Sequence, residues 1–520
     1  MIASAELHKL IRSLTQTEKR FFKVFASRHV IGEQNNYVLI FDKIAGQKEY
    51  NEEAIKIEFK GKPFMDRFPA VKNYLHQLIL KSMRSYHSGS TIDLELKEML
   101  SDIEFLYHKG LYKQCERLHA KAEKLAIETD KKNRLLEILE WKAKLLQVTN
   151  RDSEFRHFHK EVFREEERIL NTILRSLELK SEVLDIFALI RKQGFARSKT
   201  DLQLIHKVIR KYEKYNYEKL DFNDKYYLNY IRTIYFTSSG EDEKGMFYTK
   251  KNVDLLESIP VKLLEEEFER YIVSLNNLVV NLIHLRKTNE IYPYIEKIRS
   301  LATRNIRENV LLWATSYKLI LGVIIQSGDF DEAEKMIPEV TAGVELYHDK
   351  IPATDVVLFK YNLAIVYFAG KKYSQSIKTL NEIINDNDLA LRDDIQGFAR
   401  LIRLIVFWEK GELELLPYAA ISAYRFIYKR KKLYKFESLV LQFIKEKVPN
   451  INTASRQRSA FTELKGKLEQ LMHDPLEKKA LEYFDFISWV ESKISRKDFK
   501  AVAMEKLEKS SLSLRTKQDR

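Results

Sequence analysis

Apolar side chains recur along this chain at the three- and four-residue spacing that is typical of amphipathic helices. Near the start, Thr15 and Glu18 have the spacing of a capping box, which predicts a helix that begins after Thr15. An apolar stripe covers 71–83, and a second one covers 92–107. The pattern therefore predicts helices on both sides of a small, flexible junction at Ser88-Gly89-Ser90.

A unit of two helices joined by a short turn recurs between residues 91 and 448. Its clearest turns contain Gly110, Gly328, Gly370 and Gly411, each followed within three residues by an aromatic or apolar residue. Where the turns are consecutive, they recur about every 40 residues. A period of this length with two helices in each unit is the signature of a helical solenoid.

Two of these units carry small and aromatic residues where paired helices pack closely. Residues 356–390 contain Asn362-Leu363-Ala364-x-x-Tyr367 and Tyr373-x-x-Ser376, and residues 311–345 contain Gly328-Asp329-Phe330-x-x-Ala333. These motifs resemble the tetratricopeptide repeat (TPR) family, most clearly over 311–390. The period exceeds the usual ~34 residues of that family, so we expect longer helices. The resemblance implies that the first helices of the repeats line a groove that holds an extended peptide.

The chain divides into three predicted regions. Residues 1–90 form an N-terminal helical domain, with a loose helix-turn-helix layout over 52–59 and 71–86. Residues 91–448 form the TPR-like solenoid. Residues 449–520 form capping helices, one of which begins at Asp474-Pro475, and a basic tail. The predicted fold class is all-α, an α-solenoid of two-helix TPR-like repeats with N- and C-terminal helical caps.

Composition agrees with this fold class. The 520 residues include only 15 Gly and 9 Pro, so tight turns are few and β-sandwiches and glycine-rich phosphate loops are disfavoured. Apolar residues make up 45%, which is enough for a sizeable core. No signal peptide is evident, and the most apolar stretch, 311–326, is interrupted by Lys318. We therefore expect a cytoplasmic protein without membrane insertion.

Catalytic motifs are absent from the sequence. It contains no G-x-S-x-G, H-E-x-x-H or EF-hand pattern. With a single cysteine, Cys115, the chain can form neither an internal disulfide nor a structural zinc site. The position of Cys115 in its helix predicts that the thiol is packed in the core. We expect no catalytic residue, no metal and no cofactor, and hence no enzyme.

A polar face interrupts one apolar helix at Asn277, Asn281 and His284. Asn resists burial without hydrogen-bond partners. Either an internal polar network or ordinary exposure to solvent satisfies these groups, or they line a groove for a peptide backbone or carboxylate. The TPR resemblance implies that Lys318, Tyr361 and Phe368 face the same groove, although aromatics at such positions are more often core. The leading hypothesis is a scaffold that binds a protein or peptide partner, with its oligomeric state left open.

Basic clusters support an alternative hypothesis, binding of RNA or DNA. The formal net charge is +14. Residues 425–435 interleave cations with aromatics, which suits phosphate contact with base stacking. The candidate contacts there are Arg425, Lys429, Arg430 and Lys432, and those of the N-terminal region are Lys72, Lys81 and Arg84. The simpler reading is a solvated basic helix and a plain N-terminal cap.

Overall fold

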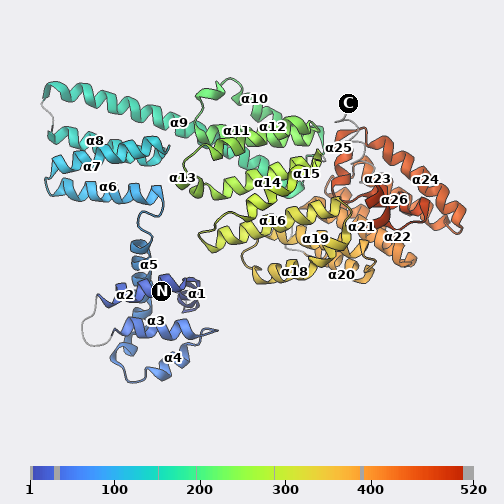
Figure 1. The fold of residues 1–520 in the computed structure, drawn as a ribbon, viewed down its shortest axis with the longest axis horizontal. Coiled ribbons are helices and arrows are strands. Elements are labelled where there is room, and N and C mark those ends of the chain that lie inside the picture. The colour runs from blue at the N-terminus through green and yellow to red at the C-terminus, as the bar shows by residue number, and fades with distance from the viewer. Residues whose placement is uncertain are drawn as a thin grey trace. The chain divides into compact units, whose positions relative to one another are not determined.

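The structure, a computed structural model, describes residues 4–28, 35–149, 152–194, 196–285, 287–386 and 392–506. Throughout these residues the regular elements are helices, and many helices that follow one another in the chain pack side by side (Figure 1). The fold is the predicted all-α solenoid. The chain forms two compact units, Met1–Leu170 and Asn171–Arg520. The predicted domain boundaries near 90 and 448 stay predictions.

The first unit begins with a small helical core. Its elements are α1 (Ser4–Ser13), α2 (Gln16–Ser27), α3 (Asn36–Gly46), α4 (Glu52–Glu58), η1 (Pro63–Arg67) and α5 (Phe68–Tyr86). The predicted capping box is confirmed, because the Thr15 side chain accepts the Glu18 N–H and the Glu18 carboxylate accepts the Thr15 N–H. Phe22, Phe41 and Ile79 are fully buried in this core.

Three consecutive helices continue the first unit, and a fourth leads out of it. They are α6 (Ile92–His108), α7 (Tyr112–Glu128), α8 (Lys132–Thr149) and α9 (Asp152–Gln193). Cys115 is buried between α6 and α7, where its thiol points at the Ile103 carbonyl. The boundary between the two units falls within α9, which is 42 residues long and contains no Gly or Pro to interrupt it.

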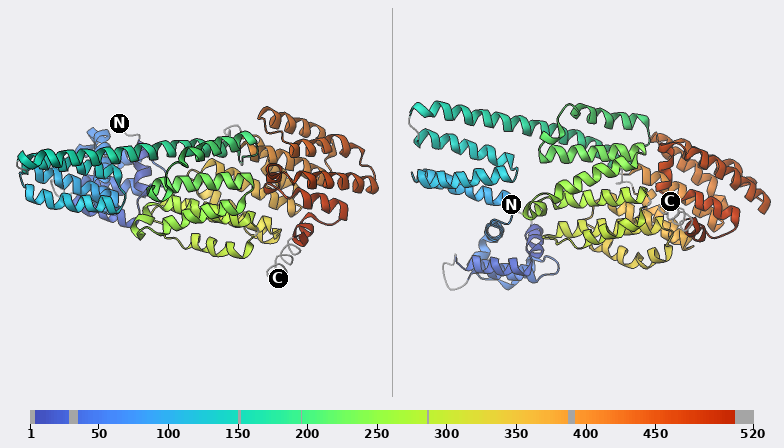
Figure 2. Two further views of the ribbon diagram at one scale, coloured as in Figure 1. Left: turned by 90° about the horizontal axis from the view of Figure 1, so that it is seen from above. Right: turned by 45° about the horizontal axis from the view of Figure 1, so that its top comes forward.

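The second unit stacks helix pairs. Its first elements are α10 (Lys199–Tyr212), η2 (Tyr217–Lys219), α11 (Phe222–Ser239), α12 (Asp242–Glu257), α13 (Val261–Glu266), α14 (Phe268–His284), α15 (Thr288–Arg299), α16 (Ile306–Gln326), α17 (Phe330–Lys335), α18 (Ile337–Leu346), α19 (Ala353–Ala369), α20 (Tyr373–Ile384), α21 (Asp393–Lys410), η3 (Leu413–Leu415) and α22 (Leu416–Lys429). Both views in Figure 2 show these helices lying beside their neighbours in the chain.

The last elements pack beside α21 and α22 (Figure 1). They are α23 (Lys435–Gln442), the π-helical η4 (Phe443–Lys447), η5 (Val448–Asn450), α24 (Ala454–Leu471), α25 (Pro475–Lys478), η6 (Lys479–Glu482) and α26 (Phe486–Ser495). The predicted helix start is confirmed, with Asp474 as N-cap and Pro475 in the first turn. The predicted basic tail, 510–520, lies outside the described residues.

The turns between paired helices share one backbone motif. After α21, the N–H of Glu412 bonds the Phe407 carbonyl, and Gly411 between them has φ of 81°. After α19, the same bond joins Lys372 to Tyr367, so Lys371, with φ of 58°, occupies the left-handed position instead of Gly370. This Schellman motif sets the turn, and glycine is the residue that adopts it without strain.

One described helix, α16, is long and apolar enough to cross a membrane on the criteria of length and composition alone. Half of its apolar window is buried inside the protein, where α16 packs against α14, α15 and α19. Core helices pass the same criteria, so this is weak evidence for a membrane span.

Candidate functional site

Residues 472–506, the C-terminal segment, cross the helix pairs that the TPR resemblance assigns to a groove. The Tyr361 hydroxyl on α19 donates a hydrogen bond to the Tyr483 carbonyl at 3.0 Å. The Tyr483 ring stacks on Phe398 of α21, with 4.1 Å between ring centres and 7° between planes. Phe368 on α19 contacts the rings of Phe484 and Phe499, at 5.6 and 5.4 Å. The segment is therefore part of the core of the second unit.

A buried carboxylate, Asp394, anchors this contact. It accepts hydrogen bonds from the Arg392 guanidinium at 2.8 Å and from the Tyr483 hydroxyl at 2.7 Å. Burial alone would raise the pKa of Asp394, but the ion pair with Arg392 and the hydrogen bonds outweigh it and lower that pKa. Burial and the Asp394 charge raise the pKa of Tyr483 well above its usual value.

Gly194 makes room for this carboxylate. A Cβ atom at Gly194 would lie 2.0 Å from the Asp394 Oδ2 atom, and its φ of +78° is also one that only glycine adopts freely. The glycine therefore lets the end of α9 approach the start of α21.

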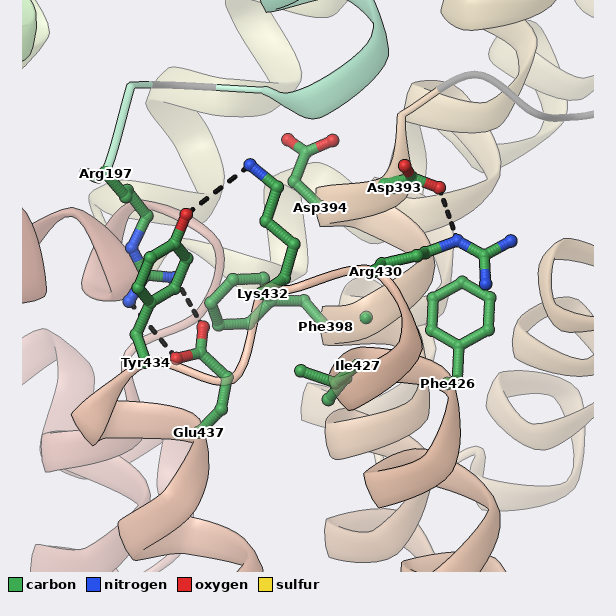
Figure 3. Close-up of a pocket in the computed structure, with 11 residues that line it drawn as sticks. Arg197, Asp393, Asp394, Phe398, Phe426, Ile427, Arg430, Lys432, Tyr434 and Glu437 are labelled. Atoms are coloured by element: carbon green, nitrogen blue, oxygen red, sulfur yellow. Dashed lines mark hydrogen bonds and ion pairs between the residues drawn. The ribbon is translucent and has the colours of Figure 1, made fainter. Parts of the chain in front are cut away.

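A second buried ion pair ties the segment to the α9–α10 connection (Figure 3). The Arg197 guanidinium pairs with Glu437 and lies 3.5 Å from the Glu477 carboxylate. Glu477 also accepts the backbone N–H groups of Lys435 and Phe436, at 3.1 and 3.0 Å, and so caps α23 from a distance in sequence. Burial raises the pKa of Glu437, although Arg197 opposes this.

The cavity at this ion pair holds about 20 Å³, enough for one water molecule. In Figure 3, Arg197, Tyr434 and Glu437 lie on one side of it, and Arg430, Asp393 and Phe426 lie on the other. Its charged groups are close to balance, since Arg430 pairs with Asp393 and Arg197 pairs with Glu437. This arrangement is suited to holding elements together.

A much larger cavity, of about 440 Å³, lies between the helix pairs and the C-terminal segment. The ends of α14 and α16 and the start of α17 provide one side, and residues 472–506 provide the other. Apolar side chains line much of it, namely Ile283, Ile291, Val323, Ile325, Phe330, Ile365, Leu481, Phe484, Phe499 and Ala503. A volume of this size with such a lining is typical of ligand pockets.

Four ionisable groups form one wall of the large cavity. Lys479 pairs with Glu482 at 2.8 Å, and the His284 ring lies 3.4 Å from Glu482 and 3.8 Å from Asp242. Burial would raise the pKa of Glu482, but His284 and Lys479 outweigh burial and lower it. The cavity thus combines an apolar floor with a polar wall whose charges face one another.

The predicted groove residues do not come together in one place. His284 lines the large cavity, and Tyr361 and Phe368, which are 2% and 3% exposed, pack beneath the C-terminal segment. Lys318 pairs with Asp355 at 2.8 Å and does not line the cavity. Their role in binding a partner stays a prediction.

Asn281 lies in an internal polar network. Its side-chain NH₂ donates to the Thr249 hydroxyl at 3.1 Å and to the Asn277 carbonyl at 2.8 Å, and its oxygen accepts from the Thr237 hydroxyl at 2.9 Å. These bonds join α14 to α11 and α12. Asn277 itself is half-buried on α14. For Asn281, these hydrogen bonds favour the internal polar network over the groove.

The predicted nucleic-acid contacts differ in exposure. Lys72 is buried and pairs with Glu52 at 2.6 Å, while Lys81 and Arg84 are exposed on α5. On α22, Arg425 and Lys429 are exposed. Arg430 pairs with Asp393 at 2.6 Å, and Lys432 lies half-buried, 3.4 Å from the Tyr434 hydroxyl.

Sequence reasoning missed the residues that hold the site together. Asp394, Arg197 and Glu477 are far apart in the chain, and each reads locally as an ordinary surface charge. Gly194 falls near an expected helix–helix turn, and nothing in the local sequence marks its close approach to Asp394.

In the part of the chain that the structure describes, no three His, Cys, Asp or Glu side chains group closely enough to hold a metal ion.

No protein-family model matches this chain, and no curated protein is significantly similar to it.

Proposed function

We propose that this chain is a non-enzymatic, TPR-like binding scaffold that takes an apolar segment of a protein partner into the large cavity. The observation that carries the proposal is the cavity itself, with about 440 Å³ of space between the helix pairs and the C-terminal segment. A cytoplasmic location is part of the same proposal.

The lining supports a peptide segment as the occupant. The apolar floor offers burial to apolar side chains, which is worth about 25 cal/mol for each Å² removed from water. Exposed Gln326 lies at one edge, and exposed His473 and Lys478 lie at the other. An extended chain between these edges would find hydrogen-bond partners for its backbone on both sides.

The contacts of the C-terminal segment support the same mode of binding. Tyr361 bonds a main-chain carbonyl of that segment, and aromatic side chains pack around it. Helices α19 and α21 therefore already hold an irregular stretch of chain through a main-chain hydrogen bond and ring packing. The large cavity lies beside these contacts and would hold a partner segment in the same way.

Site-specific photo-crosslinking in cells tests the proposal. A benzoyl-phenylalanine in place of exposed Lys478, at the cavity edge, is expected to form a discrete adduct with another protein. The same group in place of Tyr292, which is 51% exposed on α15, is the matched control.

A bulky substitution at the cavity edge, Gln326→Trp, is expected to remove the adduct at 478 and to leave any background at 292 unchanged. Adducts that are the same at both positions, or that persist in the Gln326→Trp chain, would show that the cavity does not take a protein partner.

A further inference from the structure

A row of exposed aromatic side chains covers the outer face of α22. Tyr418, Tyr424 and Tyr428 are 77%, 46% and 64% exposed. The Tyr424 and Tyr428 rings stack on each other, with 5.7 Å between centres and 14° between planes. The opposite face of the helix, with Ala419, Ala420 and Ala423, is buried against the core. Helix packing therefore leaves the tyrosine row facing outward.

Two cations lie within the same outer face. Arg425 and Lys429 are exposed, Arg425 seven residues after Tyr418 and Lys429 four residues after Arg425, and these steps keep side chains on one side of a helix. Among the described residues, no carboxylate forms an ion pair with either of them. Both positive charges are thus available beside the tyrosine rings.

A third observation comes from the edge of α22 that faces α21. The guanidinium groups of Arg400 and Arg430 lie 3.4 and 3.7 Å from the centre of the Phe426 ring. Figure 3 shows Arg430 beside Phe426 and bonded to Asp393. The recorded hydrogen bonds of Arg400 go to neutral groups, the Gln396 and Ile384 carbonyls and the Gln396 side chain.

Positive charge is concentrated at this edge. Burial and the neighbouring charges of Arg403 and Arg430 lower the pKa of Arg400 to about 10. Arg403 is bonded to the Asn381 amide oxygen, another neutral partner. Arg400 and Arg403 therefore add a positive potential on the α21-facing side of α22, which their neutral partners do not cancel.

We propose that this surface, formed by Tyr418, Tyr424, Arg425, Tyr428 and Lys429 with the Arg400–Phe426–Arg430 edge behind it, binds single-stranded nucleic acid. Unpaired bases stack on exposed aromatic rings, and phosphates contact the adjacent cations. In a duplex the faces of the bases are stacked on one another, so they are not available to stack on the tyrosine rings. An acidic peptide would use the cations and leave the stacked rings without a role. The site is separate from the large cavity, so the two proposals stand independently.

Fluorescence anisotropy on the full chain tests the proposal, with a labelled oligouridine of about 12 nucleotides as the probe, a length within known site sizes. Binding is expected to weaken steeply with added salt. Tyr424→Ala with Tyr428→Ala is expected to weaken it at least tenfold. Tyr424→Phe with Tyr428→Phe keeps both rings and is expected to bind as the parent does. Because these side chains are exposed, the variants should keep the helical circular dichroism of the parent.

Charge reversal gives the second arm of the test. Arg425→Glu with Lys429→Glu is expected to weaken binding at least tenfold and to flatten its dependence on log salt by about 0.7 for each lost phosphate contact. Lys244→Glu with Lys250→Glu on α12 changes the net charge equally at two other exposed positions and is expected to have little effect. Four results would each overturn the proposal: no binding at 50 mM salt, equal binding of a duplex, equal binding of poly-glutamate, or equal loss in the α12 variant.

Discussion

At the scale of single residues, Asp394 concentrates more interactions than any local pattern predicts. Its carboxylate meets Arg392, which lies two residues before it, and also Tyr483 and the backbone at Gly194, two distant parts of the chain that reach it only on folding. Breaking one partner of a buried ion pair leaves an uncompensated charge, and this costs about 3–5 kcal/mol.

We therefore expect Asp394→Asn to lower the free energy of local unfolding by about 3–5 kcal/mol at neutral pH, measured by hydrogen exchange of α21 amides. Asp498→Asn breaks an exposed pair with Lys371 and is expected to cost under ~1 kcal/mol. If the α21 amides exchanged at the same rate in both variants, the buried Asp394 ion pair would contribute no more stability than the exposed one.

The same variant carries a pH signature. The folded pKa of Asp394 lies below its ordinary value of 3.8, so its ionised form stabilises the fold above that pH. This contribution is lost as the pH falls through the folded pKa. The gap in stability between the parent and Asp394→Asn is therefore expected to be constant from pH 7 to about pH 5 and to shrink below about pH 4. A gap that widened in acid would contradict the assigned ion pair.

Asn281 gives a second prediction at this scale. Asn281→Ala removes the acceptor of the buried Thr237 hydroxyl and one partner of the Thr249 hydroxyl, which keeps its bond to the Gly245 carbonyl. Leaving buried polar groups unpaired costs about 1–3 kcal/mol, so we expect a loss of stability of that size in α14 exchange. Asn276→Ala, on the same helix and half-buried, is the control and is expected to change little. An Asn281→Ala chain as stable as the parent would show that the network is dispensable.

At the scale of elements, periodicity was sufficient for the helices but not for all of the turns. The apolar stripes predicted helices over 71–83 and 92–107, which correspond to α5 and α6. Local sequence also marked the helix starts at Thr15 and Asp474, because capping depends on neighbours three residues away. At Lys371 a non-glycine residue holds the left-handed position, so a search for glycine places that turn one residue early.

Glycines inside helices test helix packing. A Cβ atom on Gly343 of α18 would lie 2.0 Å from the Trp313 ring, whereas one on Gly322 of α16 would meet nothing within 4 Å. Gly343→Ala is expected to destabilise the second unit by about 1–3 kcal/mol through overpacking. Gly322→Ala should stabilise it by about 0.5–1 kcal/mol through lower chain entropy in the unfolded state. Thermal unfolding compares the two, and equal shifts would contradict the packing of α18 on Trp313.

At the scale of the whole molecule, the two compact units have separate apolar cores. Phe22 and Phe41 belong to the core of α1–α5, and Trp489, Phe461 and Phe398 belong to the core around α21. Long-range pairings of this kind could not be predicted from sequence, because the contact of α26 with α24 and α21 depends on packing rather than on any local signal.

Trp489→Ala tests whether these cores are independent. The side chain is 1% exposed, packs on Phe461 and donates its N–H to Glu409 at 2.8 Å. Its loss is expected to cost about 3–5 kcal/mol. Faster exchange should be confined to the helices around α21, with the amides of α2 and α5 unchanged. Faster exchange in α2 and α5 as well would show that the cores are coupled.

The burial of α21 has a consequence for synthesis on the ribosome. Its Phe398 ring stacks on Tyr483 and contacts Phe486, so part of the cover of α21 comes from residues 472–506. At about 5–20 residues per second, translation from residue 410 to residue 506 takes roughly 5–20 s, and Phe398 lacks Tyr483 and Phe486 until these residues have been made. We expect the growing chain to expose this part of the core during that interval. A chain truncated before residue 472 would lack the contribution of Tyr483, Phe484, Phe486 and Trp489 to the core.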